Sequence, residues 1–280
     1  SGFFFMTKKV AIQGIEGSFH HIVSQTYFEE AVEVQPYLSF SEVVESLISK
    51  TSDVAIMALE NSIAGSIIPN YAHINDQDLH ITGECFLEIQ HNLMALKGQS
   101  IQDIKEVFSH PMALLQCKEF FKQYPHIKLI EDTDTAEVAK RIYKHQLQGI
   151  AAIASVEAAQ LFELEILANS IQTIKHNETR FVVVERAPSS QNATIINKAS
   201  VKFLLDHKRG SLAAMLNVMS DCNLNLTKIQ SLPKIDTPWK YAFFVDITFE
   251  TYSDYEKGKA IMKLMAEEFK ILGEYKNAKK

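Results

Sequence analysis

Short apolar segments that each run into a polar turn and then an amphipathic stretch recur along the first two thirds of the chain. "VAIQG" is followed by "IEGSFHHIVSQTYFEEA", and "DVAIMAL" is followed by "ENSIAGSIIPNYAHI". The same order returns at residues 106–108, 127–130 and 149–154, and a further apolar run, Phe181–Val184, follows a polar cluster. Strands that alternate with helices predict an α/β fold, with a mainly parallel sheet and helices on both faces.

The pattern changes after Ala187. Residues 187–198 ("APSSQNATIINK") are polar, with Pro, Ser and Asn, and we interpret them as a linker. Beyond them we predict a strand at 199–205, a helix at 211–222, an antiparallel pair at 224–235 and 239–250 around a turn at 236–238, a helix at 255–269 and a strand at 270–275. This β-α-β-β-α-β order is that of a ferredoxin-like α+β sandwich. The predicted domains are therefore residues 7–187 and 199–280, joined by a linker at 188–198.

Composition excludes several function classes. The 280 residues carry a formal charge of −6 and no long basic run, which argues against nucleic acid as a partner. No apolar run reaches the roughly 18 residues of a membrane span, and Phe3–Phe5 is too short for a signal peptide. The chain begins Ser1-Gly2, so we take Met6 as the natural start, and we expect a cytoplasmic protein.

Motifs for cofactors and metals are also missing. Gly14-Ile-Glu-Gly17 is not GxGxxG, no GKS or GKT follows a glycine-rich loop, and no GxSxG or HExxH occurs. The three cysteines, Cys85, Cys117 and Cys222, are widely spaced and are expected to be reduced thiols. We predict no cofactor and no metal site.

Polar residues gather where the predicted strands end. Each is first of all a candidate helix N-cap, but in a parallel sheet these turns share the edge where ligands bind. Exposed N–H groups and helix dipoles there favour anions, so the pattern predicts a small carboxylate-bearing ligand in a cleft. The turns are Gly17-Ser18, Asn61-Ser62, Ser109-His110, Thr133–Thr135 and Ser155.

Several segments, in order, resemble one family. "GIEGSFHHIVSQTYF", "LENSIAGSI", "FSHPMALLQC" and "AAIASVEAAQLFELEILANSIQTIKHNETRFVVVE", with the C-terminal domain, are similar to prephenate dehydratase over about Lys8–Glu250. The resemblance implies a two-lobed catalytic domain with a periplasmic-binding-protein-like fold, and a C-terminal ACT domain. It implies conversion of prephenate to phenylpyruvate with loss of water and CO2, in phenylalanine biosynthesis, with phenylalanine as allosteric feedback inhibitor. No chorismate mutase segment precedes Met6, so the likeness is to the monofunctional form.

The resemblance also assigns site residues. Thr179 of the "TRF" motif becomes the donor to the leaving ring hydroxyl, and Arg180 is catalytic with it. In a regular strand the side chain of Arg180 points away from the face of Thr179, so Arg180 either binds substrate from an edge or pairs with a carboxylate of the scaffold. Asn177 and Phe181 lie on the same face as Thr179. Gln116 lies seven residues after Ser109, a spacing that brings both to one helical face. The substrate-binding set implied is Ser18, Phe19, Glu60, Asn61, Ser62, Ser109, Gln116, Asn177 and Phe181.

The chain departs from the family pattern in two places. His20 stands where a hydroxyl residue is usual, and its titration could alter substrate contacts or pH dependence. The regulatory motif, usually ESRP, is Gln230-Ser231-Leu232-Pro233 here, which puts the strength of the effector site in question. The effector residues implied are Gly210, Ser211, Leu212, Ala213, Asn225, Leu226, Ser231, Leu232 and Pro233. ACT domains pair side by side, which implies a homodimer or homotetramer.

Two other functions stay open. Arogenate dehydratase performs the same chemistry on the aminated substrate, and sequence does not separate the two. A non-catalytic amino-acid sensor on the same fold is the second alternative, although such a sensor has no need of a donor at the leaving group.

Overall fold

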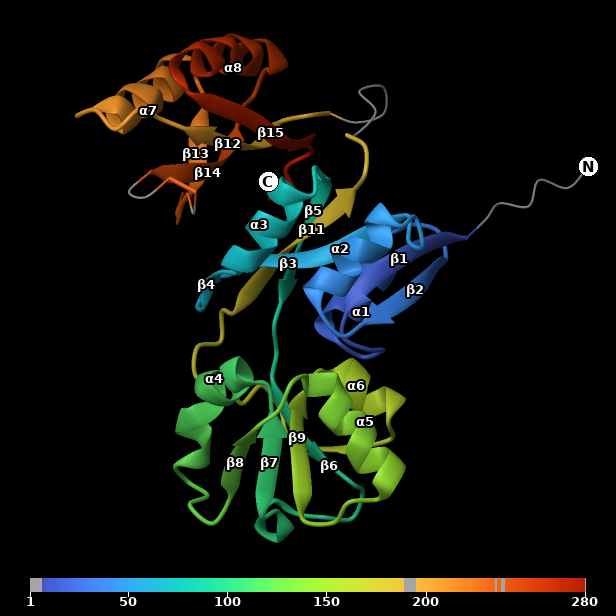
Figure 1. Ribbon diagram of the computed structural model, residues 1–280. Coiled ribbons are helices and arrows are strands. Elements are labelled where there is room, and N and C mark those ends of the chain that lie inside the picture. The colour runs from blue at the N-terminus through green and yellow to red at the C-terminus, as the bar shows by residue number, and fades with distance from the viewer. Residues whose placement is uncertain (1–6, 189–194, 235, 238–239, 280) are drawn as a thin grey trace, which may run out of the picture. The chain divides into compact units, whose positions relative to one another are not determined.

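The computed structural model describes residues 7–188, 195–234, 236–237 and 240–279 (Figure 1). Met6, Phe3–Phe5, most of the predicted linker and the end of the predicted turn at 236–238 lie outside these ranges. The chain divides into two compact units: unit 1 comprises residues up to Ile67 and 85–181, and unit 2 comprises 68–84 and 182 onward. The sequence did not predict that 68–84 belongs with the C-terminal residues; the domain borders proposed at 187 and 199 stay predictions.

The first sheet of unit 1 has β1 at its centre. It pairs in parallel with β2 and β3, and β11 lies beyond β3 in the strand order. Val10, Ile12 and Ile56 are fully buried in these strands, which explains their continuous apolar runs. The elements of this part are β1 (Lys8–Gln13), α1 (Phe19–Tyr27), β2 (Val32–Tyr37), α2 (Phe40–Ile48), β3 (Val54–Asn61), β4 (Gly65–Ser66) and β11 (Glu178–Glu185).

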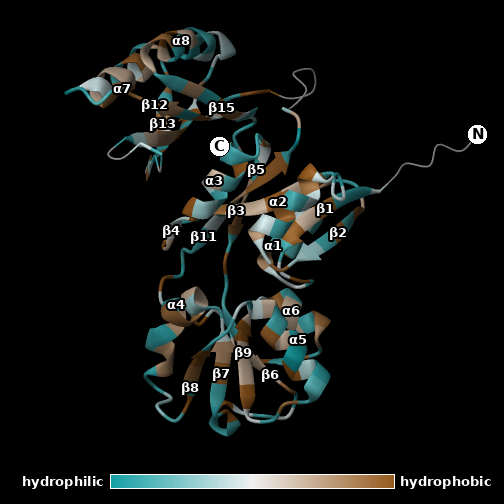
Figure 2. Cartoon of the chain, viewed as in Figure 1, coloured by the Kyte–Doolittle hydropathy of each residue, from teal (hydrophilic) through white to brown (hydrophobic). Residues whose placement is uncertain are grey.

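The second sheet of unit 1 has the order β10-β6-β9-β7-β8. Strand β7 pairs in parallel with β8 and β9, whereas β6 runs antiparallel to β9. One hydrophobic cluster joins the sheet to α4 and another joins it to α5 and α6, so both faces are covered, and the strands are largely brown in Figure 2. The elements are β6 (Asn92–Ala95), the 3-10 turn Ile101–Asp103, β7 (Glu106–Ser109), α4 (Pro111–Phe121), β8 (Lys128–Glu131), α5 (Thr135–His145), β9 (Ile150–Ala154), α6 (Val156–Leu161) and β10 (Glu165–Ala168).

Unit 2 confirms the predicted β-α-β-β-α-β order. Its antiparallel strands follow the order β13-β14-β12-β15, and β5 joins β15 through Gly273 and Ile81. Together with the two sheets of unit 1, this confirms a mixed α/β chain with a ferredoxin-like sandwich. The elements are α3 (Ile68–Asp76), β5 (His80–Glu88), β12 (Lys198–Leu204), α7 (Ser211–Asp221), β13 (Asn225–Pro233), β14 (Tyr241–Thr248), α8 (Tyr252–Met265) and β15 (Glu268–Tyr275).

One predicted boundary is wrong. The last helix was expected to reach Phe269, but α8 ends at Met265 and Ala266 is already extended. Strand β15 then begins at Glu268, because Glu268 and Phe269 take the ladder positions opposite Leu204 and Phe203. Pairing with a neighbouring strand overrides the local helical pattern here.

Several features bear on the expected absences. No helix in the described ranges combines the length and the hydropathy needed to cross a membrane. The three cysteines are free thiols, and burial raises the pKa of the Cys117 thiol to about 12. Among the described residues no group of three or more His, Cys, Asp or Glu side chains gathers as a metal site would require.

Candidate active site

A cavity of about 490 Å³ lies within unit 1. Polar turns at the ends of strands in both sheets contribute to its wall, as the sequence predicted for a ligand site. Six of the predicted substrate and catalytic residues lie in this wall: Ser18, Phe19, Asn61, Gln116, Thr179 and Phe181. Other wall residues, Leu38, His91 and Met112 among them, were not singled out by sequence reasoning, whereas His110 belongs to one of the predicted polar turns.

Four helices begin at the cavity wall, and their caps line it. Ser18 caps α1 by accepting from the backbone N–H of His21 at 3.2 Å, and His110 caps α4 by accepting from that of Met112 at 3.2 Å. Ser39 caps α2 by accepting from the backbone N–H of Glu42 at 3.2 Å, and Asp134 caps α5. The N-terminus of a helix carries a partial positive charge, so the starts of α1, α2 and α4 favour a bound anion, whereas that of α5 already holds the Asp134 carboxylate.

The predicted roles of two polar turns need correction. Ser109 is the last residue of β7 and not an N-cap, because its fully buried hydroxyl donates to the carbonyl of Ile153 at 2.9 Å. Since α4 starts at Pro111, Ser109 and Gln116 do not share a helical face, and only Gln116 lines the cavity. After β3 no helix begins until Ile68, so Asn61 and Ser62 are not helix caps.

The orientation of the Asn61 amide is fixed by the backbone. Its Oδ1 accepts from the N–H groups of Ile63 and Ala64, both at 2.9 Å. Its Nδ2 must therefore face the other way, where it donates to Oγ1 of Thr179 at 2.9 Å. Because Thr179 accepts from Asn61, its own hydroxyl hydrogen is left for donation elsewhere, and Thr179 lines the cavity. The geometry thus leaves the Thr179 hydroxyl able to donate a hydrogen bond to a ligand in the cavity.

The same chain of hydrogen bonds continues to Gln116. Asn61 also donates to Oδ1 of Asn177 at 2.7 Å, and Nδ2 of Asn177 donates to Oε1 of Gln116 at 2.8 Å. Nε2 of His91 lies 2.9 Å from the same Oε1 and acts as a second donor. With its oxygen occupied twice, Gln116 has its amide N–H groups available to a ligand oxygen in the cavity. Asn177 is fully buried and supports the wall from behind.

His20 and His91 form neutral parts of the wall. Burial lowers the pKa of His20 to about 4, and its Nε2 accepts from the backbone N–H of Ala58 at 3.1 Å. The His20 ring meets Phe40 and Phe181 edge to face, with centroids 5.4 and 5.0 Å away. The pKa of His91 is also lowered, mainly by burial, against an opposing hydrogen bond to Gln116. Both imidazoles are neutral near pH 7.

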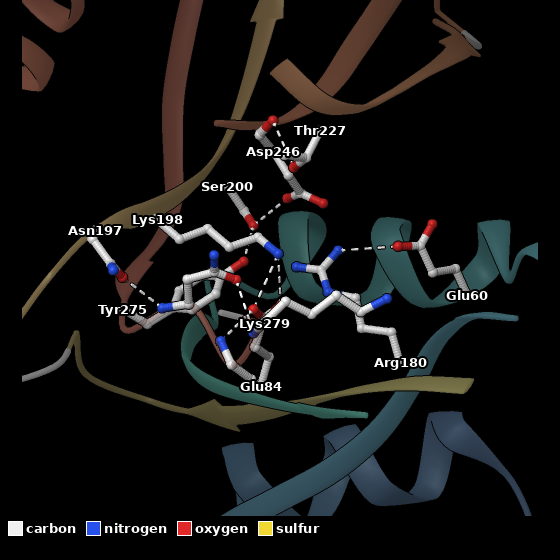
Figure 3. Close-up of polar contacts among 12 residues, drawn as sticks. Glu60, Glu84, Arg180, Asn197, Lys198, Ser200, Thr227, Asp246, Tyr275 and Lys279 are labelled. Carbon is white, nitrogen blue, oxygen red and sulfur yellow. Dashed lines mark hydrogen bonds and ion pairs between the residues drawn. The ribbon is translucent and has the colours of Figure 1, made fainter. Parts of the chain in front are cut away.

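Arg180 points away from the cavity, as strand alternation predicts. Its side chain is 1% exposed, and Nη1 lies 3.5 Å from Oε1 of Glu60 (Figure 3). Neither residue is part of the cavity wall, nor is Ser62, whose hydroxyl accepts from the backbone N–H of Glu178 at 2.9 Å. A role of Arg180, Glu60 and Ser62 in substrate binding stays a prediction.

The predicted effector residues all lie in unit 2 and occupy three places. Gly210 begins α7 in the left-handed conformation with φ 83°, and Ser211 donates to Asp206 at 2.6 Å. Asn225 and Leu226 start β13, and Ser231–Pro233 end it. Leu232 and Pro233 border a cavity of about 390 Å³ whose wall also carries Lys202, Lys234 and Glu268.

Comparisons with known proteins agree on one family. Residues 10–189 match the family model described as prephenate dehydratase. A bifunctional chorismate mutase/prephenate dehydratase of Buchnera aphidicola (Schizaphis graminum) is 31% identical over 84% of this chain, which spans 62% of that protein's length. An arogenate dehydratase/prephenate dehydratase of Arabidopsis thaliana is 34% identical over 85% of this chain, which spans 64% of that protein's length. Prephenate dehydratase of Arthrobacter aurescens, solved in complex with L-Phe, has the same fold, with a TM-score of 0.85 and 23% sequence identity. The match covers 96% of this chain and 90% of that one.

Proposed function

The chain belongs to the prephenate dehydratase family, and we propose that it removes water and CO2 from prephenate, or from its aminated counterpart arogenate. The observation that carries this proposal is the orientation of Thr179. Its hydroxyl oxygen accepts from Asn61, so its hydroxyl hydrogen can be donated to a ligand in the cavity. A donor of this kind suits the ring hydroxyl that must leave.

The remaining chemistry needs little from the protein. As the C–O bond breaks, Thr179 donates to the departing oxygen, and the ring carboxylate leaves as CO2 while its bonding electron pair enters the ring. The leaving oxygen takes the proton of the Thr179 hydroxyl and becomes water, and Thr179 then regains a proton from solvent. Aromatisation drives the step, so binding and orientation dominate catalysis. The starts of α1 and α4, with Ser18 and the amide of Gln116, would hold the substrate carboxylates.

Turnover of prephenate by the purified chain tests this function. Thr179→Ala removes the donor and should lower kcat by roughly 10²-fold to 10³-fold. Thr179→Ser keeps a hydroxyl and should retain most of the rate. Asn61→Asp offers the Thr179 hydroxyl an acceptor in place of a donor, so the hydroxyl should turn away from the substrate and kcat should fall by about 10²-fold.

The outcomes separate the alternatives. Equal rates for the wild type and Thr179→Ala would remove Thr179 from the mechanism. Folded wild-type protein that binds but does not convert either prephenate or arogenate would instead be a sensor. Circular dichroism and thermal unfolding of each variant would show that lost activity is not lost structure.

The regulatory half of the proposal concerns unit 2. Its β-α-β-β-α-β sandwich serves as an ACT domain that binds phenylalanine at Gly210–Ala213 and Ser231–Pro233 and assembles as a homodimer or homotetramer. The likeness of its motifs to the family supports this, as does the L-Phe complex of a protein with the same fold. Rates measured with and without L-Phe, beside molar mass from light scattering, test it. Unchanged rates at high L-Phe would show that L-Phe does not regulate this chain.

A further inference from the structure

The charge of the cavity is unusual for a site that holds a dianion. Among the described residues, its wall contains no Lys and no Arg. His20 and His91 are neutral because burial lowers their pKa values, and Nδ1 of His110 accepts from the backbone N–H of Met112 at the start of α4. Asp134 is the one carboxylate among the described wall residues.

Asp134 has one carboxylate oxygen in use and one to spare. Oδ1 accepts from the backbone N–H groups of Ala136 at 2.8 Å and Glu137 at 3.0 Å, at the positive end of α5. Burial is the largest influence on the pKa of Asp134 and raises it, as does the nearby Glu137, whereas these two donors and the neighbouring His110 lower it. Oδ2 has no hydrogen bond within the described residues, and it lies beside Gly14, where a Cβ would come within 3.0 Å of it. The nearby Arg141 pairs with Asp132 instead, at 2.7 Å.

Capping alone does not account for a charge here. Ser, Thr and Asn cap helices as well as Asp does, and none of them places a negative charge in the wall. The carboxylate also occupies the N-terminus of α5, which therefore cannot serve a substrate carboxylate as the starts of α1 and α4 can. For prephenate, with two carboxylates and no cation, Asp134 adds only repulsion.

Arogenate differs from prephenate in the group that would meet Asp134. It keeps both carboxylates and the ring hydroxyl, and it carries an ammonium where prephenate has a keto oxygen. We propose that Asp134 pairs with this ammonium through Oδ2, so that the cavity favours arogenate over prephenate. This proposal rests on the dehydratase function above and names the preferred substrate of the same site. Thr179 serves the ring hydroxyl in both cases, and the products with arogenate are phenylalanine, water and CO2.

The test is the ratio of kcat/KM for arogenate to kcat/KM for prephenate, measured on the full chain. We expect a ratio well above one for the wild type. Asp134→Asn keeps a capping oxygen and removes the charge, and it should lower the ratio at least tenfold, mainly by raising KM for arogenate. Glu137→Gln removes the same charge from the same turn of α5, outside the cavity wall, and should leave the ratio unchanged.

Each result decides the matter. A wild type that prefers prephenate, or an Asp134→Asn ratio within twofold of the wild type, overturns the pairing while leaving the dehydratase function intact. An equal fall in the ratio for Glu137→Gln would assign the effect to long-range charge and also overturn it. No turnover of either compound by folded wild type overturns both proposals.

Discussion

At the scale of single residues, His20 shows how a titratable side chain becomes part of an apolar wall. Its ring packs against Phe40 and Phe181, and its Nε2 accepts from the backbone N–H of Ala58, a hydrogen bond that requires an unprotonated nitrogen. The sequence indicated a histidine that could titrate near neutrality at this position. Burial moves its pKa to about 4, so His20 does not ionise in the range where the enzyme would work.

The lowered pKa of His20 makes stability depend on pH. Its pKa is about 4 in the folded protein and 6.5 in the unfolded chain, so its contribution is fully present above pH 6.5 and is lost as the pH falls toward 4. Between pH 7.5 and 5 this loss amounts to about 2 kcal/mol. His20→Gln, whose side-chain oxygen can accept from Ala58, should remove that part of the pH dependence.

Urea unfolding of both proteins at the two pH values measures the difference. His21 and His91, whose pKa values are also lowered by burial, are present in both proteins and cancel in the comparison. Identical pH dependence of the free energy of unfolding would show that His20 is not held neutral by the fold.

At the scale of elements, Gly17 fixes where α1 begins relative to α6. It has φ +86°, a Cβ there would lie 3.1 Å from Cα of Ala158, and its carbonyl accepts from Ser155 at 2.7 Å. Gly65 has a similar φ of +83° with nothing within 4 Å of a Cβ. Gly65→Ala should therefore cost only the left-handed strain, about 1 kcal/mol, and Gly17→Ala about 1–3 kcal/mol more.

Chemical denaturation of the two glycine variants gives this difference directly. Gly17→Ala should also lower kcat/KM, because it displaces Ser18 at the cavity. Equal losses of stability would mean that α6 yields to the added methyl group without cost.

The elements also show what local sequence can predict. Strands buried on both faces, such as β3 and β9, have unbroken apolar runs and were predicted to within a few residues. Strand β2 was not, since it lies at the edge of its sheet, contains Pro36 and has no fully buried residue. Lys198 was assigned to the linker because it is polar, but its ammonium is buried against Glu84, which lies far away in sequence.

Part of the candidate site could likewise be predicted from the sequence, and part could not. Motif order predicted Asn61, Gln116 and Thr179, and strand alternation predicted the direction of Arg180. The partnership of His91 with Gln116, and the unoccupied oxygen of Asp134, depend on tertiary packing that no local pattern encodes.

At the scale of the whole molecule, the border between the two units falls inside two strands. Strand β5 crosses it between Glu84 and Cys85, and β11 crosses it between Phe181 and Val182, two residues after Thr179. Within unit 2, Nζ of Lys198 binds both carboxylate oxygens of Glu84, at 3.0 and 2.9 Å, and so fastens the first strand of the sandwich to β5 (Figure 3). The chain also crosses the border between Ile67 and Ile68, and the two strands are two of these three covalent routes by which an effector bound to unit 2 could act on Thr179.

If phenylalanine regulates the chain through these strands, its binding should be visible in their backbones. We expect saturating L-Phe to slow amide hydrogen exchange in peptides covering 80–88 and 178–185, while peptides of α4 and β8 exchange as before. D-Phe at the same concentration is the control for solvent effects. Coupling between sites is reciprocal, so a bound substrate analogue should weaken L-Phe binding by the factor by which L-Phe weakens the analogue. Inhibition by L-Phe with protection confined to 199–275 would rule out both strands as the route.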